Sequence, residues 1–69
     1  MLHGKKVSYG RMTITIGKNK SWYGYETYDP YDDTIIDHEE GLKSEEIALS
    51  VAKNYATAYM NTHIRRNNE

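Results

Sequence analysis

Residues Ser44–Arg66 read SEEIALSVAKNYATAYMNTHIRR, and this stretch decides the fold. Ser44 can accept a hydrogen bond from a backbone N–H at a helix start, and Glu45 and Glu46 place negative charge at the positive end of the helix dipole. The apolar residues that follow recur at the spacing of a helix with one buried stripe. They are Ile47, Ala48, Val51, Ala52, Tyr55, Ala58 and Tyr59, with His63 next in phase. The stretch therefore predicts one long C-terminal helix.

The residues before the helix predict β-strands. Arg11–Ile16 alternates cleanly, with Met12, Ile14 and Ile16 on one face, and we expect this apolar row to meet the helix stripe. The last strand would be an edge strand, because acidic residues discourage pairing with other molecules. The expected strands are Lys5–Tyr9, Arg11–Ile16, Ser21–Tyr28 and Thr34–Asp37.

The third expected strand carries aromatic residues on both faces. Trp22 and Tyr28 share one face, and Tyr23 and Tyr25 share the other. One of these faces must cover the core, so the other leaves aromatic rings near solvent.

Glycines mark the expected interruptions. Gly10 predicts a tight turn or a bulge, and Gly24 predicts a bulge or a close approach to the backbone. Gly17–Lys20 is expected to form a turn, Asp29-Pro30 to end the aromatic strand, and Glu39–Gly41 to form a loop.

The fold class that follows is α+β, with a three- or four-stranded antiparallel sheet packed against one long C-terminal helix. Residues Trp22–Ala52 give an aromatic strand, a turn, a final strand and a Ser-Glu-Glu helix start. This plan resembles that of double-stranded-RNA-binding-like domains, the arm-binding domains of phage integrases and small antitoxins. The resemblance lies in the order of elements, and it carries no functional residue over to this chain.

The chain has 69 residues and no cysteine, so we expect one small domain over residues 1–69 without disulfides. No apolar run follows Lys5 and Lys6, so we expect no signal peptide and no membrane span. A cytoplasmic protein is the interpretation that these features favour.

The net charge of −1 conceals a strong asymmetry along the chain. The residues up to Tyr25 carry a net charge of +5, whereas Glu26–Glu46 carries nine acidic residues against Lys43. These blocks predict either two electrically distinct surfaces or mutual neutralisation within the fold.

The acidic, tyrosine-rich segment is the first candidate for function. Tyrosine offers a large contact area at low entropic cost, and carboxylates steer a protein toward a basic partner. The alternative is a solvated edge that keeps the protein soluble. The expected partner-binding residues are Tyr28, Tyr31, Asp32, Asp33 and Asp37.

The basic segment is the second candidate, as a small nucleic-acid-binding module. Cations interleaved with stacking rings suit contact with a phosphate backbone or with single strands. The alternative is ordinary surface lysines. The residues that would make this contact are Lys18, Lys20, Trp22 and Tyr23.

Catalytic and metal-binding patterns are weak. A calcium-loop spacing can be traced through acidic residues, but Tyr31 stands where an oxygen ligand is expected and Thr34 where glycine is needed. Its acidic positions are Asp29, Asp33, Asp37 and Glu40. The histidines His3, His38 and His63 have no metal spacing, and no phosphate loop or nucleophile elbow is present. We therefore expect neither enzymatic activity, nor a metal, nor a cofactor.

The functional hypothesis from sequence is a non-catalytic protein-binding module. Compact, acid-patched chains without motifs resemble phage-encoded modulators of host enzymes, including inhibitors that mimic nucleic acid. A homodimer is a further expectation, because the second aromatic face of the sheet could pair with another copy.

Overall fold

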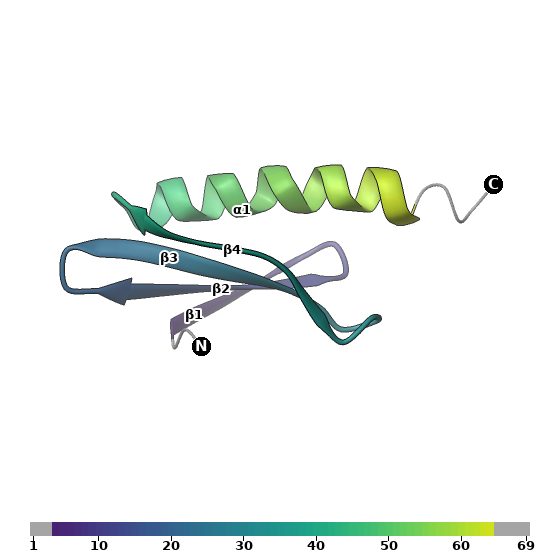
Figure 1. Ribbon diagram of the computed structural model, residues 1–69, viewed down its shortest axis with the longest axis horizontal. Helices are drawn as coiled ribbons and strands as arrows, with labels where there is room; N and C mark the ends of the chain where they lie inside the picture. The colour runs from purple at the N-terminus through teal and green to yellow at the C-terminus, as the bar shows by residue number, and fades with distance from the viewer. Residues whose placement is uncertain (1–3, 65–69) are drawn as a thin grey trace.

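The computed structural model describes residues 4–64, with side chains up to residue 62. It has a four-stranded antiparallel sheet in the order β1-β2-β3-β4, followed by one C-terminal helix that lies along one face of the sheet (Figure 1). This confirms the expected α+β fold. The elements are β1 Gly4–Tyr9, β2 Met12–Asn19, β3 Trp22–Asp29, β4 Thr34–Leu42, α1 Glu45–Tyr59 and a π-helical turn η1 Met60–Ile64.

Two tight hairpins join the first three strands. Tyr9 pairs with Met12, so Gly10 and its neighbour form a two-residue turn in which Gly10 has φ +61°. The turn of the second hairpin is shorter than the sequence predicted, and its first strand is longer. Its turn begins at Lys20, with φ +49°, whereas Gly17 lies within β2 and is buried. The predicted turn at Gly17–Lys20 is therefore wrong for its first three residues, because the β2–β3 pairing continues through Asn19.

The last strand is longer than predicted. β4 continues through the expected loop Glu39–Gly41 to Leu42, and two register shifts let it follow β3. One shift lies beside Gly24, where an added Cβ would stand 2.8 Å from the carbonyl oxygen of Glu39. This confirms the expected close backbone approach at Gly24.

The start of the helix is also confirmed. Ser44 is extended, and its Oγ accepts the N–H of Ile47 at 3.1 Å. The α-helix ends at Tyr59 and continues as the π-helical turn. The predicted end at Arg66 and the expected role of His63 lie outside the described residues and side chains.

The buried stripe of the helix differs from the prediction. Ala48 and Ala52, both expected in the stripe, are fully buried together with Ala56, but Ile47 is 43% exposed and Tyr55 is 47% exposed. Ala58, also expected in the stripe, is exposed too. Small side chains allow the helix backbone to approach the sheet closely, so the alanine line faces inward and the larger residues turn toward the flank.

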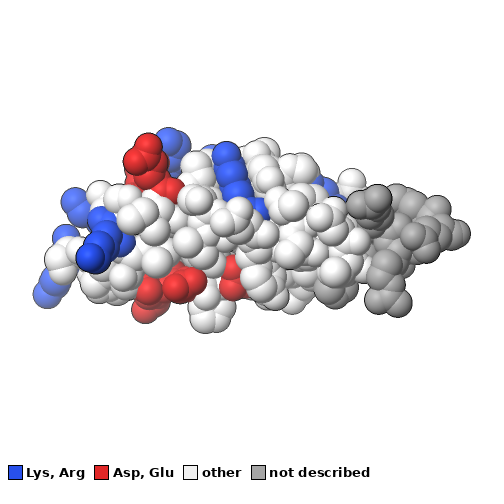
Figure 2. Space-filling view, turned by 90° about the horizontal axis from the view of Figure 1, so that it is seen from above, with Lys and Arg blue, Asp and Glu red and all other residues white. Residues whose placement is uncertain are grey.

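The core lies between this alanine line and the middle strands. Met12, Ile14 and Ile16 point toward the helix as predicted, and each is less than 5% exposed. Tyr25 joins Ile14 and Ile16 under the helix, and Thr27 is buried on the same face. Seen from the helix side, most of the length of α1 presents an uncharged surface (Figure 2). Within the described residues, no helix has the length and apolarity needed to cross a membrane.

Candidate functional site: the acidic tyrosine turn

The acidic tyrosine turn, residues 28–33, is built around the carboxylate of Asp29. Asp29 ends β3 with its side chain fully buried. Its Oδ2 accepts a hydrogen bond from Nη2 of Arg11 at 2.8 Å, and its Oδ1 accepts the backbone N–H of Tyr31 at 3.0 Å. Burial opposes ionisation of this carboxyl, but the two hydrogen bonds and the charge of Arg11 outweigh it and hold the pKa of Asp29 below its usual value. The carboxylate thus fixes the path of the turn.

Tyr31 projects from this turn and is 73% exposed. The guanidinium of Arg11 lies over its ring, with Cζ 4.5 Å from the ring centroid. Because Arg11 is itself held by Asp29, the ring has a fixed support on one side. The Nε of Arg11 is buried and has no hydrogen-bond partner among the described residues, so its placement depends on the Asp29 contact and the stacking.

Two further tyrosines tie down the carboxylates of the turn. The hydroxyl of Tyr59, at the end of α1, donates to Asp29 and to Asp32, at 3.3 Å in both cases. The hydroxyl of Tyr28 donates to Oδ1 of Asp33. Burial and the nearby carboxylates raise the pKa of Tyr59, and the hydrogen bond to Asp33 raises that of Tyr28. These hydroxyls satisfy oxygen lone pairs but neutralise no charge.

Asp37 lies outside the turn, although the sequence grouped it with the turn residues. It sits on β4 opposite Thr27, and it accepts a hydrogen bond from the buried Tyr25 hydroxyl at 2.5 Å. Burial and this bond raise the pKa of Tyr25 far above its usual value. The structure therefore brings four of the five predicted partner-binding residues together in the turn and assigns Asp37 to the flank of the sheet.

The sequence did not reveal the residues that support the site. Arg11 was counted as a strand cation and Tyr59 as a member of the helix stripe, yet both reach Asp29 from distant parts of the chain. The one local signal was Asp29-Pro30-Tyr31, because an aspartate at a strand end commonly bonds to the backbone two residues later.

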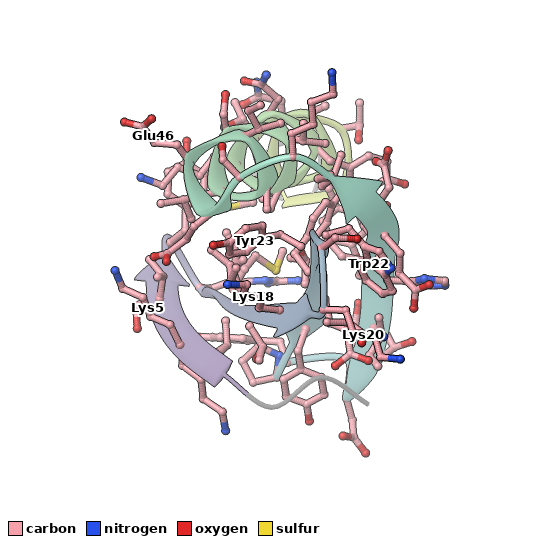
Figure 3. The ribbon with its side chains drawn as sticks, turned by 90° about the vertical axis from the view of Figure 1, so that its left-hand side faces the viewer. Lys5, Lys18, Lys20, Trp22, Tyr23 and Glu46 are labelled. Carbon is pink, nitrogen blue, oxygen red and sulfur yellow. The ribbon has the colours of Figure 1, made fainter. Side chains whose placement is uncertain are left out.

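The four residues of the basic alternative do not form one surface (Figure 3). Lys18 and Tyr23 lie together on the helix side, with the lysine Nζ 5.6 Å from the ring centroid. Trp22 lies on the opposite side of β3, where its Cζ3 would be 3.4 Å from a Cβ added at Gly24. Lys20 is exposed in the turn between β2 and β3.

The described part of the chain contains no cluster of side chains that would support metal binding. No group of three or more His, Asp or Glu side chains there is arranged to hold a metal ion. Asp29 and Asp37, from the calcium-loop spacing, are instead bonded to Arg11 and Tyr25. His38 is exposed on β4 opposite Glu26.

Comparisons with protein-family models, curated proteins and solved structures find no match to this chain. A function for this chain is therefore inferred from the geometry of the acidic tyrosine turn.

Proposed function

We propose that this chain is a non-catalytic protein-binding module that contacts a basic partner through the acidic tyrosine turn. The observation that carries the proposal is Tyr31, which is 73% exposed while its ring is supported by Arg11. An aromatic side chain that is already fixed loses little conformational entropy on binding, and such residues commonly anchor protein interfaces. Tyr31 is thus suited to be the central contact.

The charges around Tyr31 support a basic partner. Asp32 and Asp33 are exposed, and their hydrogen bonds come from neutral tyrosine hydroxyls. Because these hydroxyls bring no positive charge, both carboxylates are available to attract cations. Asp29, in contrast, is matched by Arg11 and serves as the support. Exposed charges of this kind chiefly raise the association rate and are screened by salt.

A protein that normally binds nucleic acid is the class of basic partner that fits this chemistry. Its binding groove presents lysines and arginines spaced for phosphates, and carboxylates on a fixed turn can occupy the same places. We therefore propose a small inhibitor or accessory factor, with Asp37 extending the acidic contact along the β4 flank.

Affinity capture from the organism that encodes the chain, followed by binding kinetics with the captured protein, tests the proposal. The variant Asp32→Lys/Asp33→Lys reverses the turn charge, and Lys18→Glu/Lys20→Glu is the matched control at the other end of β3. We expect the first variant to slow association about ten-fold or more and to remove its salt dependence, with the control unchanged. Equal association rates for wild type and the acid-reversed variant would refute the assignment of the turn.

Nucleic-acid binding is the second candidate, but the geometry supports it less. Lys18 and Tyr23 face the helix side and Trp22 faces the other side, so rings and cations do not line one track. Titration with random single- and double-stranded oligonucleotides separates the two functions. Salt-sensitive binding that disappears in Lys18→Glu/Lys20→Glu would favour this candidate over the proposed one.

A further inference from the structure

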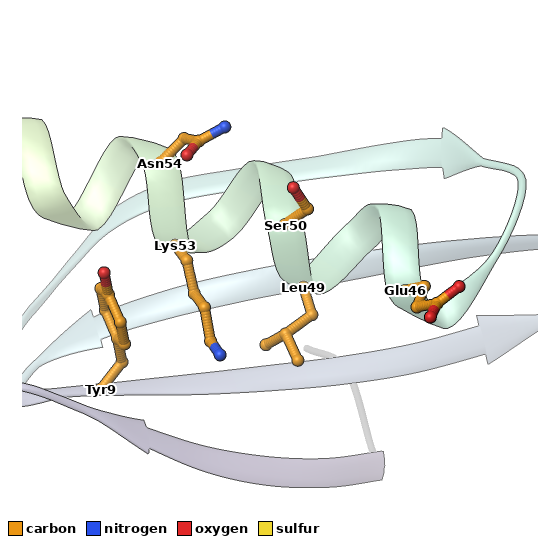
Figure 4. A pocket seen from close by; sticks show the side chains of 6 residues that line it. All are labelled: Tyr9, Glu46, Leu49, Ser50, Lys53 and Asn54. Atoms are coloured by element: carbon orange, nitrogen blue, oxygen red, sulfur yellow. The ribbon is translucent and has the colours of Figure 1, made fainter.

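The edge of the sheet at β1 borders a groove beside α1. Among the described strands β1 pairs only with β2, so its outer edge carries backbone N–H and C=O groups without a strand partner. The groove has a volume of about 380 Å³ and opens to solvent (Figure 4). It is lined by Tyr9 of β1 and by Glu46, Leu49, Ser50, Lys53 and Asn54 of α1.

The two edges of the sheet differ in their capacity to accept another strand. β1 pairs with β2 in one unbroken register from Gly4 to Tyr9. β4 has two register shifts, and its longest run that follows β3 without interruption is Asp37–Glu39. Both edges carry charged residues, but the bulges of β4 protect it against pairing, so the unbroken β1 is the edge that remains open.

We propose that a second copy of this chain occupies the β1 edge. The two β1 strands pair antiparallel across a two-fold axis that passes beside Val7 and runs perpendicular to the sheet. The result is one eight-stranded sheet with both helices on the same face. The two grooves then join into a single channel between the helices.

The strand sequence selects this register. A perpendicular axis keeps helix-facing residues beside helix-facing residues, so the axis must pass through a residue rather than between two. An axis at Lys6 would set the two copies of this lysine directly opposite each other, which is unfavourable. An axis at Val7 sets Lys5 opposite the partner's Tyr9, and Lys6 opposite the partner's Ser8. Cation and ring then meet on the helix side.

The helix is complementary to itself about the same axis. Lys5 contacts Glu45 at 3.0 Å, and Tyr9 contacts Thr57 at 2.7 Å, so Val7, midway between them, lies level with the middle of α1, near Val51. An antiparallel helix pair centred between residues 49 and 50, less than half a helical turn from that level, places Glu46 opposite the partner's Lys53, and Lys53 opposite the partner's Glu46. The dimer contains this pair of opposite charges twice.

The spacing suits contact through side chains. Because α1 lies over β2 and β3, four to five strand separations place the two helix axes about 19 to 24 Å apart on a flat sheet. This exceeds direct helix packing, so only long side chains could meet across the channel. The sheet curves toward the helix, which brings the two helices closer together (Figure 3). Leu49 and the Lys53 stem point from α1 toward the sheet, and Tyr9 rises from β1 to meet them (Figure 4).

Sedimentation equilibrium of the full chain, from about 1 µM to about 500 µM, tests the proposal. We expect a reversible monomer–dimer equilibrium. Glu46→Lys and Lys53→Glu each set like charges opposite each other twice, and each should weaken dimerisation roughly ten-fold. Lys20→Glu, in a turn away from the edge, is the control and should leave the equilibrium unchanged. Circular dichroism of each variant establishes that it is folded.

Restoration of the charge pairs makes the test specific. The double variant Glu46→Lys/Lys53→Glu again sets opposite charges against each other and should regain dimerisation. An equimolar mixture of the two single variants should also dimerise, because one copy then has two cations where the other has two carboxylates. A monomer at every concentration, single variants that dimerise like wild type, or a failure of both restorations would overturn the proposal.

Discussion

The two turns at the ends of β3 have opposite charge and opposite degrees of support. In the acidic tyrosine turn, the buried carboxylate of Asp29 accepts hydrogen bonds from an arginine, a backbone N–H and a tyrosine hydroxyl. In the basic turn at residues 20–21, both residues are exposed. Beside this turn, Lys18 lies over the ring of Tyr23. A charged turn becomes a defined surface when one of its charges is buried and paired.

The largest expected effect comes from removing the buried charge. Asp29→Asn would leave Arg11 without its carboxylate, and we expect the free energy of unfolding to fall by about 3 kcal/mol. Lys18→Gln, at the basic end, should change it by less than about 0.5 kcal/mol. Urea denaturation of both variants measures the contrast. Equal stabilities would show that the two turns are supported alike.

Two glycines outside these turns, Gly10 and Gly41, allow a second comparison, between a crowded and an open backbone position. Gly10 has φ +61°, and an added Cβ would stand 2.7 Å from Sδ of Met60, whereas Gly41 has φ +80° and open space around it. We expect Gly10→Ala to lower the free energy of unfolding by about 2 kcal/mol and Gly41→Ala by about 1 kcal/mol. In both variants alanine must adopt a positive φ, but only at Gly10 must the new methyl group also displace a neighbouring side chain. Thermal unfolding that ranks Gly41→Ala as the more damaging would contradict this packing.

The tyrosine that links the helix to the turn should have a smaller effect. Tyr59→Phe removes a hydroxyl that donates to Asp29 and Asp32, and we expect a loss of about 1 kcal/mol. Tyr55→Phe is the control, because Tyr55 is 47% exposed on the same helix. In Asp29→Asn the effect of Tyr59→Phe should shrink, since the two residues share a contact. If the two losses in the free energy of unfolding were strictly additive, Tyr59 and Asp29 would not interact.

The smallest effect is expected in the pH dependence of stability. Folding lowers the pKa of Asp29 below its ordinary value of 3.8. The stability that ionised Asp29 contributes is therefore fully present above pH 3.8 and is lost as the pH falls through the lowered pKa. Urea midpoints of wild type and Asp29→Asn should therefore converge in acid. A constant difference between them down to the lowest pH would exclude ionised Asp29 as its source.

The sequence was sufficient for the architecture. The alternation of Arg11–Ile16 and the cap at Ser44 are local patterns, and both were confirmed, as was the order of strands and helix. The rotation of the helix was not predictable in this way. Hydrophobicity favoured Ile47 and Tyr55 for the core, but close packing on the sheet selected the line of alanines.

The support of the acidic turn was equally hidden. The turn residues Tyr31, Asp32 and Asp33 were predicted from composition, because tyrosine set among carboxylates favours a contact surface. Arg11 and Tyr59 could not, since they are 18 and 30 residues from Asp29 in the sequence. Long-range ion pairs have no sequence period, so only the folded structure brings them together.

The most direct test of the central claim is amide hydrogen exchange measured by NMR on the full chain at neutral pH. The central claim is that the acidic tyrosine turn is held in one conformation and the basic turn is not. The amide of Tyr31, which donates to Asp29 at 3.0 Å, should exchange at least about ten-fold more slowly than that of Ser21 in the basic turn. Asp29→Asn should reduce this difference. Equal exchange rates at the two turns in the wild-type protein would contradict the account.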